Sequence, residues 1–199
     1  MITALIYGLL AITGFPVEYG EVQRVWHVRN ESRLVISGES NMNDFRCEVD
    51  RYYSADNLRL HDSQEEEYIF SQNEMVINLM EFDCGRKLIT RDFRESLNAD
   101  RNPEMIIRFL SLDKMPADNP NHENEKISGS LNVNIAGVTK DIKVDFKVSN
   151  NGNGTTYLNG SHHLLFSDFD LVPPTKMWGL INVKNDLEVT FNLVLQEVE

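Results

Sequence analysis

The sequence predicts an all-β fold, and two alternating segments in its last third are the clearest indication of it. One segment places Ile142, Val144 and Phe146 between charged residues, and the other repeats the pattern from Leu187 to Leu195. Successive side chains of a strand point to opposite faces, so each segment has one apolar and one polar face. Such strands close into a barrel or pack against a second sheet, because their apolar faces must be buried.

Turn-forming residues separate the other candidate strands. Ala136-Gly137 and the Asn/Gly-rich run at 150–154 each predict a turn, the second of them a hairpin. Asn159-Gly160 predicts another turn, and the polar stretch 113–125 predicts a surface loop. We expect strands over residues 25–28, 33–41, 44–50, 68–71, 75–82, 105–112, 126–135, 141–149, 155–159, 161–169 and 185–197.

One segment has helical character. Thr90 is a candidate N-cap, Asp92 falls in the first turn, and Phe93 and Leu97 lie four residues apart on one face. Pro103 and the residues before it end the helix, because proline disfavours the helical conformation in the residue that precedes it. We expect a short helix across the mouth of a barrel.

Length and charge bound the kind of protein. A chain of 199 residues with 41% hydrophobic residues fits a single all-β domain with a buried core. Its 31 acidic and 19 basic residues give a net charge of −12. This excess of acid argues against a nucleic-acid partner, which requires a basic face, and against attachment to anionic lipid by charge.

The first fifteen residues form an uncharged, nearly wholly apolar run (MITALIYGLLAITGF). A membrane-spanning helix needs about 20 such residues, so we do not expect an integral membrane protein. A secretory signal is the favoured explanation, although no Lys or Arg precedes the run. The alternative is a strand or helix packed on the domain. We assign residues 1–20 to a signal peptide or an apolar N-terminal segment, and residues 21–199 to the β domain.

Cys47 and Cys84 both lie in strand-like surroundings. In an exported protein they could form a disulfide. The bond would span 37 residues and, on the chain-entropy model, stabilise the fold by roughly 3–4 kcal/mol. Two buried free thiols are the alternative.

No arrangement of side chains predicts catalysis. The five histidines are scattered, and the adjacent pair His162-His163 would point to opposite faces of a strand, so the two cannot easily share a metal ion. The acidic run 65–67 is expected to be a solvated turn. Neither a Gly-rich phosphate loop nor a GxSxG elbow occurs. We therefore expect a protein that is not an enzyme and has no catalytic residue, metal site or cofactor.

The aromatic residues allow two interpretations of the interior. Phe109, Phe146 and Phe191 each lie in a strongly β segment. They either fill a packed core or line an apolar tunnel for a long hydrocarbon chain. Each methylene buried in a tunnel would contribute about 0.8 kcal/mol, so a chain of a dozen or more carbons could bind without a polar anchor. Composition does not separate the two interpretations.

Several motifs resemble those of the YceI-like family, in the family's order, from about residue 25 to 195. Residues 129–140 (GSLNVNIAGVTK) are the most specific and resemble the family's G-x-L-x-I-x-G-V-T-K/R hairpin. Residues 37–47 (SGESNMNDFRC) resemble its opening strand, and 91–97 (RDFRESL) with 102–109 (NPEMIIRF) resemble its helix and P-x-I-x-F strand. Residues 169–179 (FDLVPPTKMWG) resemble the late loop of a branch whose members also carry the two cysteines.

The resemblance implies an extended, lipocalin-like antiparallel β-barrel of about eight strands that can hold a small ligand in its lumen. Family members are exported, typically periplasmic, and bind polyisoprenoid lipids such as quinone tails, with no catalytic residues assigned. It thus implies a periplasmic or secreted protein that sequesters or carries an isoprenoid-like chain. A ligand-free structural or interaction module with a packed core is the alternative. The lumen residues that we predict are Ile107, Phe109, Ile142, Val144, Phe146, Val189, Phe191 and Leu193, with Phe93 and Leu97 covering the mouth.

Overall fold

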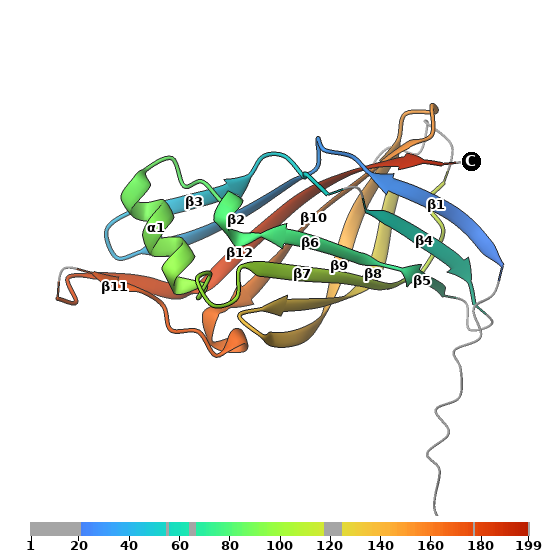
Figure 1. Cartoon of the computed structure of the whole chain (residues 1–199). Helices are drawn as coiled ribbons and strands as arrows, with labels where there is room; N and C mark the ends of the chain where they lie inside the picture. The colour runs from blue at the N-terminus through green and yellow to red at the C-terminus, as the bar shows by residue number, and fades with distance from the viewer. Residues whose placement is uncertain (1–20, 55, 64–66, 118–124, 177, 199) are drawn as a thin grey trace, which may run out of the picture.

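A computed structural model describes residues 21–54, 56–63, 67–117, 125–176 and 178–198 of the chain (Figure 1). The expected signal segment 1–20, most of the acidic run 65–67 and most of the polar stretch 113–125 lie outside these residues. The elements in chain order are β1 (Val22–Val28), β2 (Arg33–Ser40), β3 (Asp44–Val49), β4 (Asn57–Asp62), β5 (Tyr68–Gln72), β6 (Glu74–Asn78), η1 (Leu79–Glu81), α1 (Lys87–Ser96), β7 (Glu104–Leu112), β8 (Glu125–Ile135), β9 (Val138–Asn150), β10 (Thr155–Leu165), η2 (Phe166–Phe169), β11 (Thr175–Lys176) and β12 (Ile181–Glu197).

Eight strands form a closed antiparallel barrel. They pair in the order β1, β4, β5, β7, β8, β9, β10 and β12, and β12 returns to β1 where Trp26 lies opposite Glu197. The helix α1 lies at one end of this barrel (Figure 1). The predicted all-β class, with one short helix over the mouth of an extended antiparallel barrel, is therefore confirmed.

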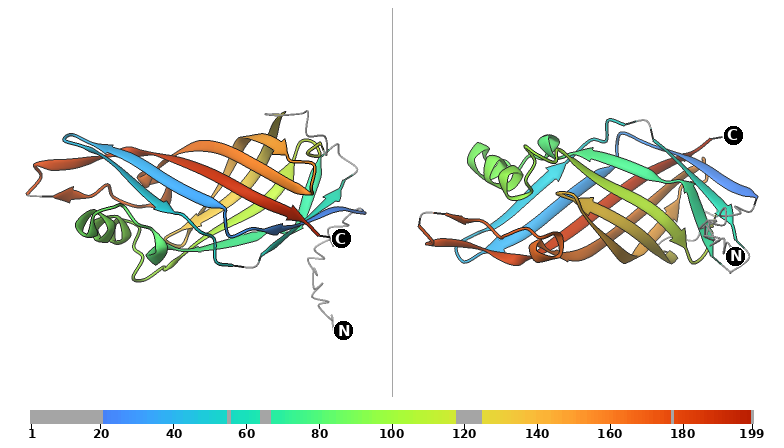
Figure 2. Two further views of the ribbon diagram at one scale, coloured as in Figure 1. Left: turned by 90° about the horizontal axis from the view of Figure 1, so that it is seen from above. Right: turned by 60° about the horizontal axis from the view of Figure 1, so that its bottom comes forward.

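The wall of the barrel continues beyond this ring of eight strands. The 17-residue strand β12 pairs with β1 near its C-terminal end and with β2 over Val183 to Asn192. The β2–β3 hairpin thereby extends the wall toward the end at which α1 lies (Figure 2). On the other side, β6 follows β5 along the same partner strand, β7. These two additions make the barrel longer than a simple eight-stranded ring.

The two additions meet at a junction that we name the β3–β6 junction. Among the described residues, β3 and β6 do not pair with each other. Instead, Glu48 and Asp83 exchange two backbone hydrogen bonds of 2.9 Å each. The neighbouring Cys47 and Cys84 form a disulfide. The predicted disulfide is thus present, and it fastens β3 to the segment that follows β6.

Turn chemistry fixes the register of the β8–β9 and β9–β10 hairpins. Ile135 lies opposite Val138, and the two residues between them, Ala136 and Gly137, have φ angles of 53° and 84°. Positive φ at both central residues is typical of a type I′ turn, whose twist matches that of paired strands. The Asn/Gly-rich run at 150–154 also joins two paired strands, β9 and β10. Both predicted turns are confirmed.

The alternating pattern decides which side chains fill the barrel. On β9, Val144, Phe146 and Val148 are buried, whereas the charged residues between them are exposed. The rings of Phe146 and Phe191 meet edge to face with their centroids 5.4 Å apart. Where β10 passes beneath Phe191 it carries Gly160, whose absent side chain leaves room for the ring. The apolar faces of the strands thus form one continuous core inside the barrel.

Some predicted strand boundaries are wrong. Asn159-Gly160 is not a turn, because β10 runs through it from Thr155 to Leu165. The predicted strand 161–169 stops at Leu165, and η2 follows. The predicted strand 75–82 likewise ends at Asn78, where the side chain caps η1 by accepting a hydrogen bond from the Met80 backbone. The strand β4 was not predicted.

The predicted N-cap of the helix is also wrong. The helix α1 begins at Lys87 with Arg86 at the N-cap position, so Thr90 lies inside it. The Thr90 hydroxyl instead accepts a hydrogen bond from the backbone N–H of Cys84 at 3.0 Å and donates one to the Asp83 carboxylate at 3.2 Å. This residue therefore ties the helix to the disulfide rather than starting the helix.

Candidate ligand-binding cavity

An apolar cavity lies inside the barrel. Its walls come from β2, β3, β6, β7, β8, β9, β10 and β12, and none of its lining residues belongs to β1, β4 or β5. The lining residues are Ser32, Arg33, Leu34, Ile36, Val49, Tyr52, Met75, Ile77, Met105, Ile107, Phe109, Leu131, Val133, Ile135, Ile142, Phe146, His162, Leu164, Val189, Phe191 and Leu193.

Most of the predicted lumen residues line this cavity. They are Ile107, Phe109, Ile142, Phe146, Val189, Phe191 and Leu193. Alternation along β7, β9 and β12 correctly assigns these side chains to the inner face. Val144 is also on the inner face of β9 and is buried, but it packs in the core and is not part of the cavity lining. Ligand contact by any of these residues stays a prediction.

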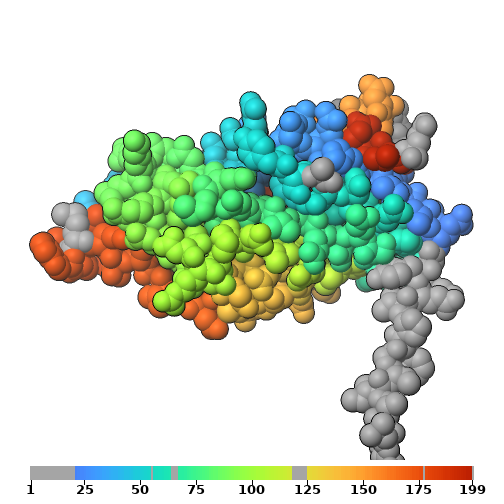
Figure 3. Space-filling model, in the orientation of Figure 1, coloured from blue at the N-terminus to red at the C-terminus, as the bar shows by residue number. Residues whose placement is uncertain are grey.

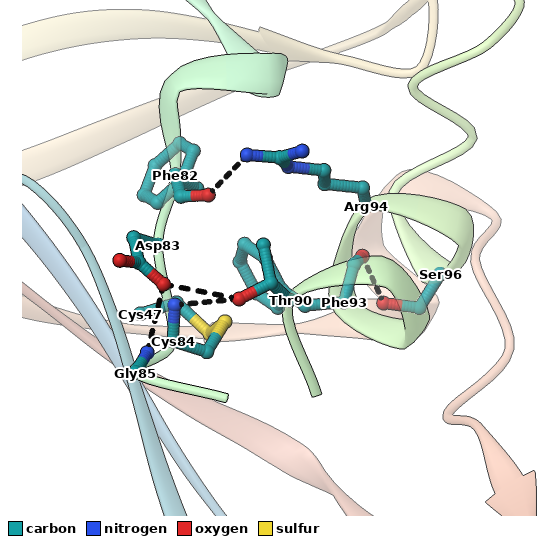
Figure 4. The surroundings of a disulfide bond; sticks show 9 residues. All are labelled: Cys47, Phe82, Asp83, Cys84, Gly85, Thr90, Phe93, Arg94 and Ser96. Carbon is teal, nitrogen blue, oxygen red and sulfur yellow. Dashed lines mark hydrogen bonds between the residues drawn. A yellow bond between two sulfur atoms is a disulfide. The ribbon is translucent and has the colours of Figure 1, made fainter. Parts of the chain in front are cut away.

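Phe93 and Leu97 lie outside the cavity lining. Both are buried, and the ring of Phe93 packs against Phe82 and Phe45, with centroid distances of 5.4 Å and 6.3 Å. The Phe93 side chain thereby fastens α1 to the residues around the disulfide (Figure 4). Phe93, which we predicted to cover the mouth, thus packs against the protein's own aromatic residues.

The wall at the β3–β6 junction is held by a small set of bonds (Figure 4). Behind the disulfide, Asp83 accepts hydrogen bonds from the Gly85 backbone at 2.9 Å and from Thr90. The Arg94 guanidinium donates to the backbone carbonyl of Phe82 at 2.8 Å. These contacts make α1, the disulfide and the end of the β6 segment one connected unit beside the cavity.

Tyr52 bridges the same junction closer to the middle of the barrel. Its hydroxyl donates a hydrogen bond to the Asp56 carboxylate and accepts one from the backbone N–H of Val76 in β6 at 3.2 Å. Burial, together with the adjacent Asp56 carboxylate, raises the pKa of Tyr52 far above its usual range. The phenol therefore stays protonated and able to donate. In the space-filling view, a small hollow marks this part of the surface (Figure 3).

His162 also lines the cavity, although the sequence analysis assigned it no role in binding. It follows Leu158 and Gly160 on the inner face of β10, whereas His163 points outward and bonds the Asp186 carboxylate at 3.2 Å. The expectation that the pair faces opposite sides of a strand is confirmed. Burial and the neighbouring His163 both lower the pKa of His162, because each disfavours a positive charge there.

Sequence reasoning also missed the contributions of β2, β6 and β8. Ile36, Met75 and Ile77 line the cavity, as do Leu131 and Val133. Each pair that shares a strand is spaced by two, so the alternation that identified β9 and β12 could have found them. Tyr52 carried no such signal, because it lies in the loop after β3 and reaches the interior only through the fold.

The cavity is small. It measures about 60 Å³, and a single water molecule needs roughly 10–15 Å³ by the same measure. Sites for drug-sized ligands usually measure about 300–1,000 Å³. Side chains therefore fill most of the barrel, and a long hydrocarbon chain requires the interior to widen.

Two further features concern the described residues alone. No helix among them is long and apolar enough to cross a membrane. Within the same residues, no group of three or more His, Cys, Asp or Glu side chains is placed to hold a metal ion. His122 lies outside the described part of the chain.

Two solved structures have similar folds. BcnA of Burkholderia cenocepacia is 15% identical with a TM-score of 0.58, and the match covers 82% of this chain and 95% of that one. A polyisoprenoid binding domain from Saccharophagus degradans, implicated in plant cell wall breakdown, is 12% identical with a TM-score of 0.61, covering 89% and 100%. None of the curated proteins compared with the chain matches it in sequence.

A closed antiparallel barrel with an apolar interior and a helix at one end defines a lipocalin-like class of protein. The sequence model of the YceI-like domain matches residues 30–195. The chain therefore belongs to the YceI-like family, as its motifs indicated.

Proposed function

We propose that this chain is an exported protein that sequesters or carries an isoprenoid-like apolar lipid inside its barrel. The observation that carries the proposal is the internal cavity, whose apolar walls come from eight strands. The similar fold from Saccharophagus degradans, described as a polyisoprenoid binding domain, supports the lipid class. The disulfide supports export to a periplasmic or extracellular site, because such bonds persist in oxidising compartments. We assign the chain no catalytic role and no cofactor.

Burial of the hydrocarbon supplies the binding free energy. Each methylene transferred from water to the interior contributes about 0.8 kcal/mol. A chain of fifteen carbons therefore has roughly 12 kcal/mol available before the entropy of binding and the cost of widening are subtracted. That margin is large enough to offset the rearrangement of a few side chains and hydrogen bonds.

The β3–β6 junction is where we expect the barrel to widen. Continuous backbone pairing joins β12 to both β10 and β2, and β7 to both β6 and β8. Between β3 and the segment from β6 to α1, the described residues are joined by the disulfide, the Glu48–Asp83 bridge, the Tyr52 hydrogen bond and the packing of Phe45 against Phe93. Separation on the Tyr52 side of the disulfide therefore breaks few hydrogen bonds, leaves the disulfide intact and enlarges the cavity directly.

The strands β9 and β10 also diverge at one end, but the 3-10 helix η2 fills the gap between them. Pairing between the two strands extends only as far as Asn159 opposite Lys147. Beyond it, η2 packs against β9, β10 and β12 and buries Phe166 and Phe169. Widening there would expose two phenylalanine rings, so the β3–β6 junction is favoured.

The small volume of the cavity favours a second candidate function. A ligand-free structural or interaction module needs only a packed core, and the interior is mostly packed. The two candidates differ in whether lipid accompanies the protein from the cell.

Organic extraction of the protein, purified without detergent and analysed by lipid mass spectrometry, tests the proposal. We expect an isoprenoid-like lipid at close to one molecule per chain. A Val189→Phe variant adds a ring to the inner face of β12 at the cavity and should recover much less lipid. A Thr190→Phe variant adds the same ring to the exposed outer face of that strand and should recover as much as the wild type.

Two results would contradict the proposal. One is the absence of any lipid from wild-type protein that also fails to bind added farnesol. The other is an equal lipid content in the Val189→Phe and Thr190→Phe variants, both folded by circular dichroism, because the lipid would then lie outside the cavity.

A further inference from the structure

The inner face of β10 places one hydrogen-bonding group in an apolar cavity. Leu158, Gly160, His162 and Leu164 alternate along that face, and His162 is part-exposed while both leucines are buried. Among the described residues, the imidazole of His162 has no hydrogen-bond partner. A polar group on a cavity wall without a partner is available to a ligand.

The other polar side chains of the lining are already engaged or face the solvent. Ser32 Oγ accepts a hydrogen bond from the backbone N–H of Val194 at 2.9 Å. Tyr52 bonds across the β3–β6 junction. Arg33 is an exposed residue at the start of β2. The imidazole is therefore the group of the lining that can meet the polar end of a bound lipid.

The charge state of the His162 imidazole determines which kind of lipid head group it can bind. The pKa of His162 is lowered, so the ring is neutral near pH 7 and offers one N–H donor and one nitrogen acceptor. A hydroxyl or carbonyl oxygen can bond to such a ring. A phosphate would bring negative charge into an apolar space, which is unfavourable, because the cation of the lining, Arg33, is exposed to solvent at the start of β2.

Strand register places the imidazole toward the end of the cavity near the disulfide. His162 lies opposite Val189, Val189 lies opposite Ile36, and Ile36 lies opposite Cys47. Two residues further along β12, away from the level of the disulfide, Phe191 lies opposite Gly160. A lipid whose chain packs along Phe191 and Phe146 can thus present its polar end to His162.

We propose that His162 binds the polar end of the lipid, and that the cavity takes a hydrocarbon chain with a neutral oxygen-bearing head, a hydroxyl or a carbonyl, in preference to a phosphorylated one. This inference rests on the proposed function, because it presupposes that the cavity binds a chain. It adds the chemistry of the head and the residue that recognises it.

Three probes with the same chain and different heads test the inference: farnesene, farnesol and farnesyl monophosphate. Their affinities are measured by displacement of N-phenyl-1-naphthylamine fluorescence at pH 7.5. We expect the wild type to bind farnesol about three- to tenfold more tightly than farnesene, which is the usual effect of one hydrogen bond. Farnesyl monophosphate should bind most weakly.

Matched variants separate the head contact from packing. His162→Leu should bind farnesol and farnesene equally, whereas His162→Gln, which keeps a neutral hydrogen-bonding group, should retain part of the preference. His163→Leu, one residue away on the outer face, should behave like the wild type. Thermal unfolding verifies that each variant is folded.

The outcomes distinguish this inference from the proposed function. Equal affinity of the wild type for farnesol and farnesene, or an unchanged preference in His162→Leu, overturns the role of His162 while leaving chain binding intact. Tighter binding of the monophosphate overturns the neutral head. A wild-type protein that binds none of the three probes and yields no lipid overturns the proposed function as well.

Discussion

Glycine and phenylalanine pack as cross-strand pairs in this barrel. A Cβ atom added to Gly160 would lie 2.4 Å from the Phe191 ring and 3.1 Å from the backbone oxygen of Asp145. A Cβ added to Gly129 would lie 2.6 Å from the Phe146 ring. The two rings can fill the interior only because the strands beneath them carry no side chain at these positions.

A Gly160→Ala substitution should therefore destabilise the protein by about 1–3 kcal/mol, the usual cost of overpacking a core. The free energy of unfolding is measured by urea denaturation. Ser161→Ala, on the exposed face of the same strand, should change it by less than about 0.5 kcal/mol. Adding Phe191→Leu to Gly160→Ala should recover part of the loss. Equal stability of the two alanine variants would show that the Phe191 ring is not confined by Gly160.

At the scale of single residues, the sequence predicted which side chains face inward better than it predicted their roles. Period-two alternation identified Phe109, Phe146 and Phe191 without knowledge of the fold. The same local reasoning misassigned Asn159-Gly160, because this pair is a strong turn signal and the need for glycine comes from a ring on another strand. Thr90 was misassigned for a similar reason, since its partners lie before the helix.

At the scale of elements, the disulfide joins parts that backbone pairing leaves separate. It links β3 to the segment between β6 and α1, and the helix is bonded to that segment through Thr90 and Arg94. Few other contacts cross the β3–β6 junction. The bond therefore holds the helix and the junction in place together.

Replacement of both cysteines, Cys47→Ser with Cys84→Ser, should lower the free energy of unfolding by roughly 3–4 kcal/mol, because the 37-residue loop is then unconstrained in the unfolded chain. Amide hydrogen exchange should rise in α1 and β3 before it rises in β8 and β9, which pair along their whole lengths. Wild-type protein treated with a thiol reductant is the control and should behave like the double variant. Uniform exchange across all strands would argue against a locally weak junction.

Prediction of the elements succeeded where alternation was long and failed where it was short. The strands β7, β8, β9 and β12 were found because each is nine or more residues long. The strand β4 was missed because its six residues include Asn57, Arg59, His61 and Asp62, and its burial depends on pairing with β1. The 3-10 segments η1 and η2 were read as strand continuations, since buried Leu79, Phe166 and Phe169 maintain apolar character there.

For the molecule as a whole, the sequence could predict an enclosed apolar interior but not the volume of its cavity. The pattern predicted an enclosed apolar space, and the barrel contains one. Its volume depends on how rings and methyl groups from many strands fit together, which no single segment encodes. The cavity of about 60 Å³ implies that an occupied barrel differs in width from the empty one.

Occupancy should consequently alter the stability of the whole protein. A ligand that binds only the folded state stabilises it by about 2.7 kcal/mol at a concentration one hundred times its dissociation constant. We expect farnesol to raise the melting temperature measured by calorimetry by several degrees, and Val189→Phe to reduce this shift. The Thr190→Phe variant is again the control. An equal shift in both variants would assign the effect to the outer surface.

The double pairing of β12 has a consequence for biosynthesis. Residues Ile181–Glu197 supply the neighbour of β10, of β2 and of β1, so neither end of the barrel can close before this strand has been synthesised. Until then the earlier strands form an open sheet whose unpaired edges and exposed apolar face favour aggregation. Newly made chains thus need protection from aggregation until Glu197 has been synthesised.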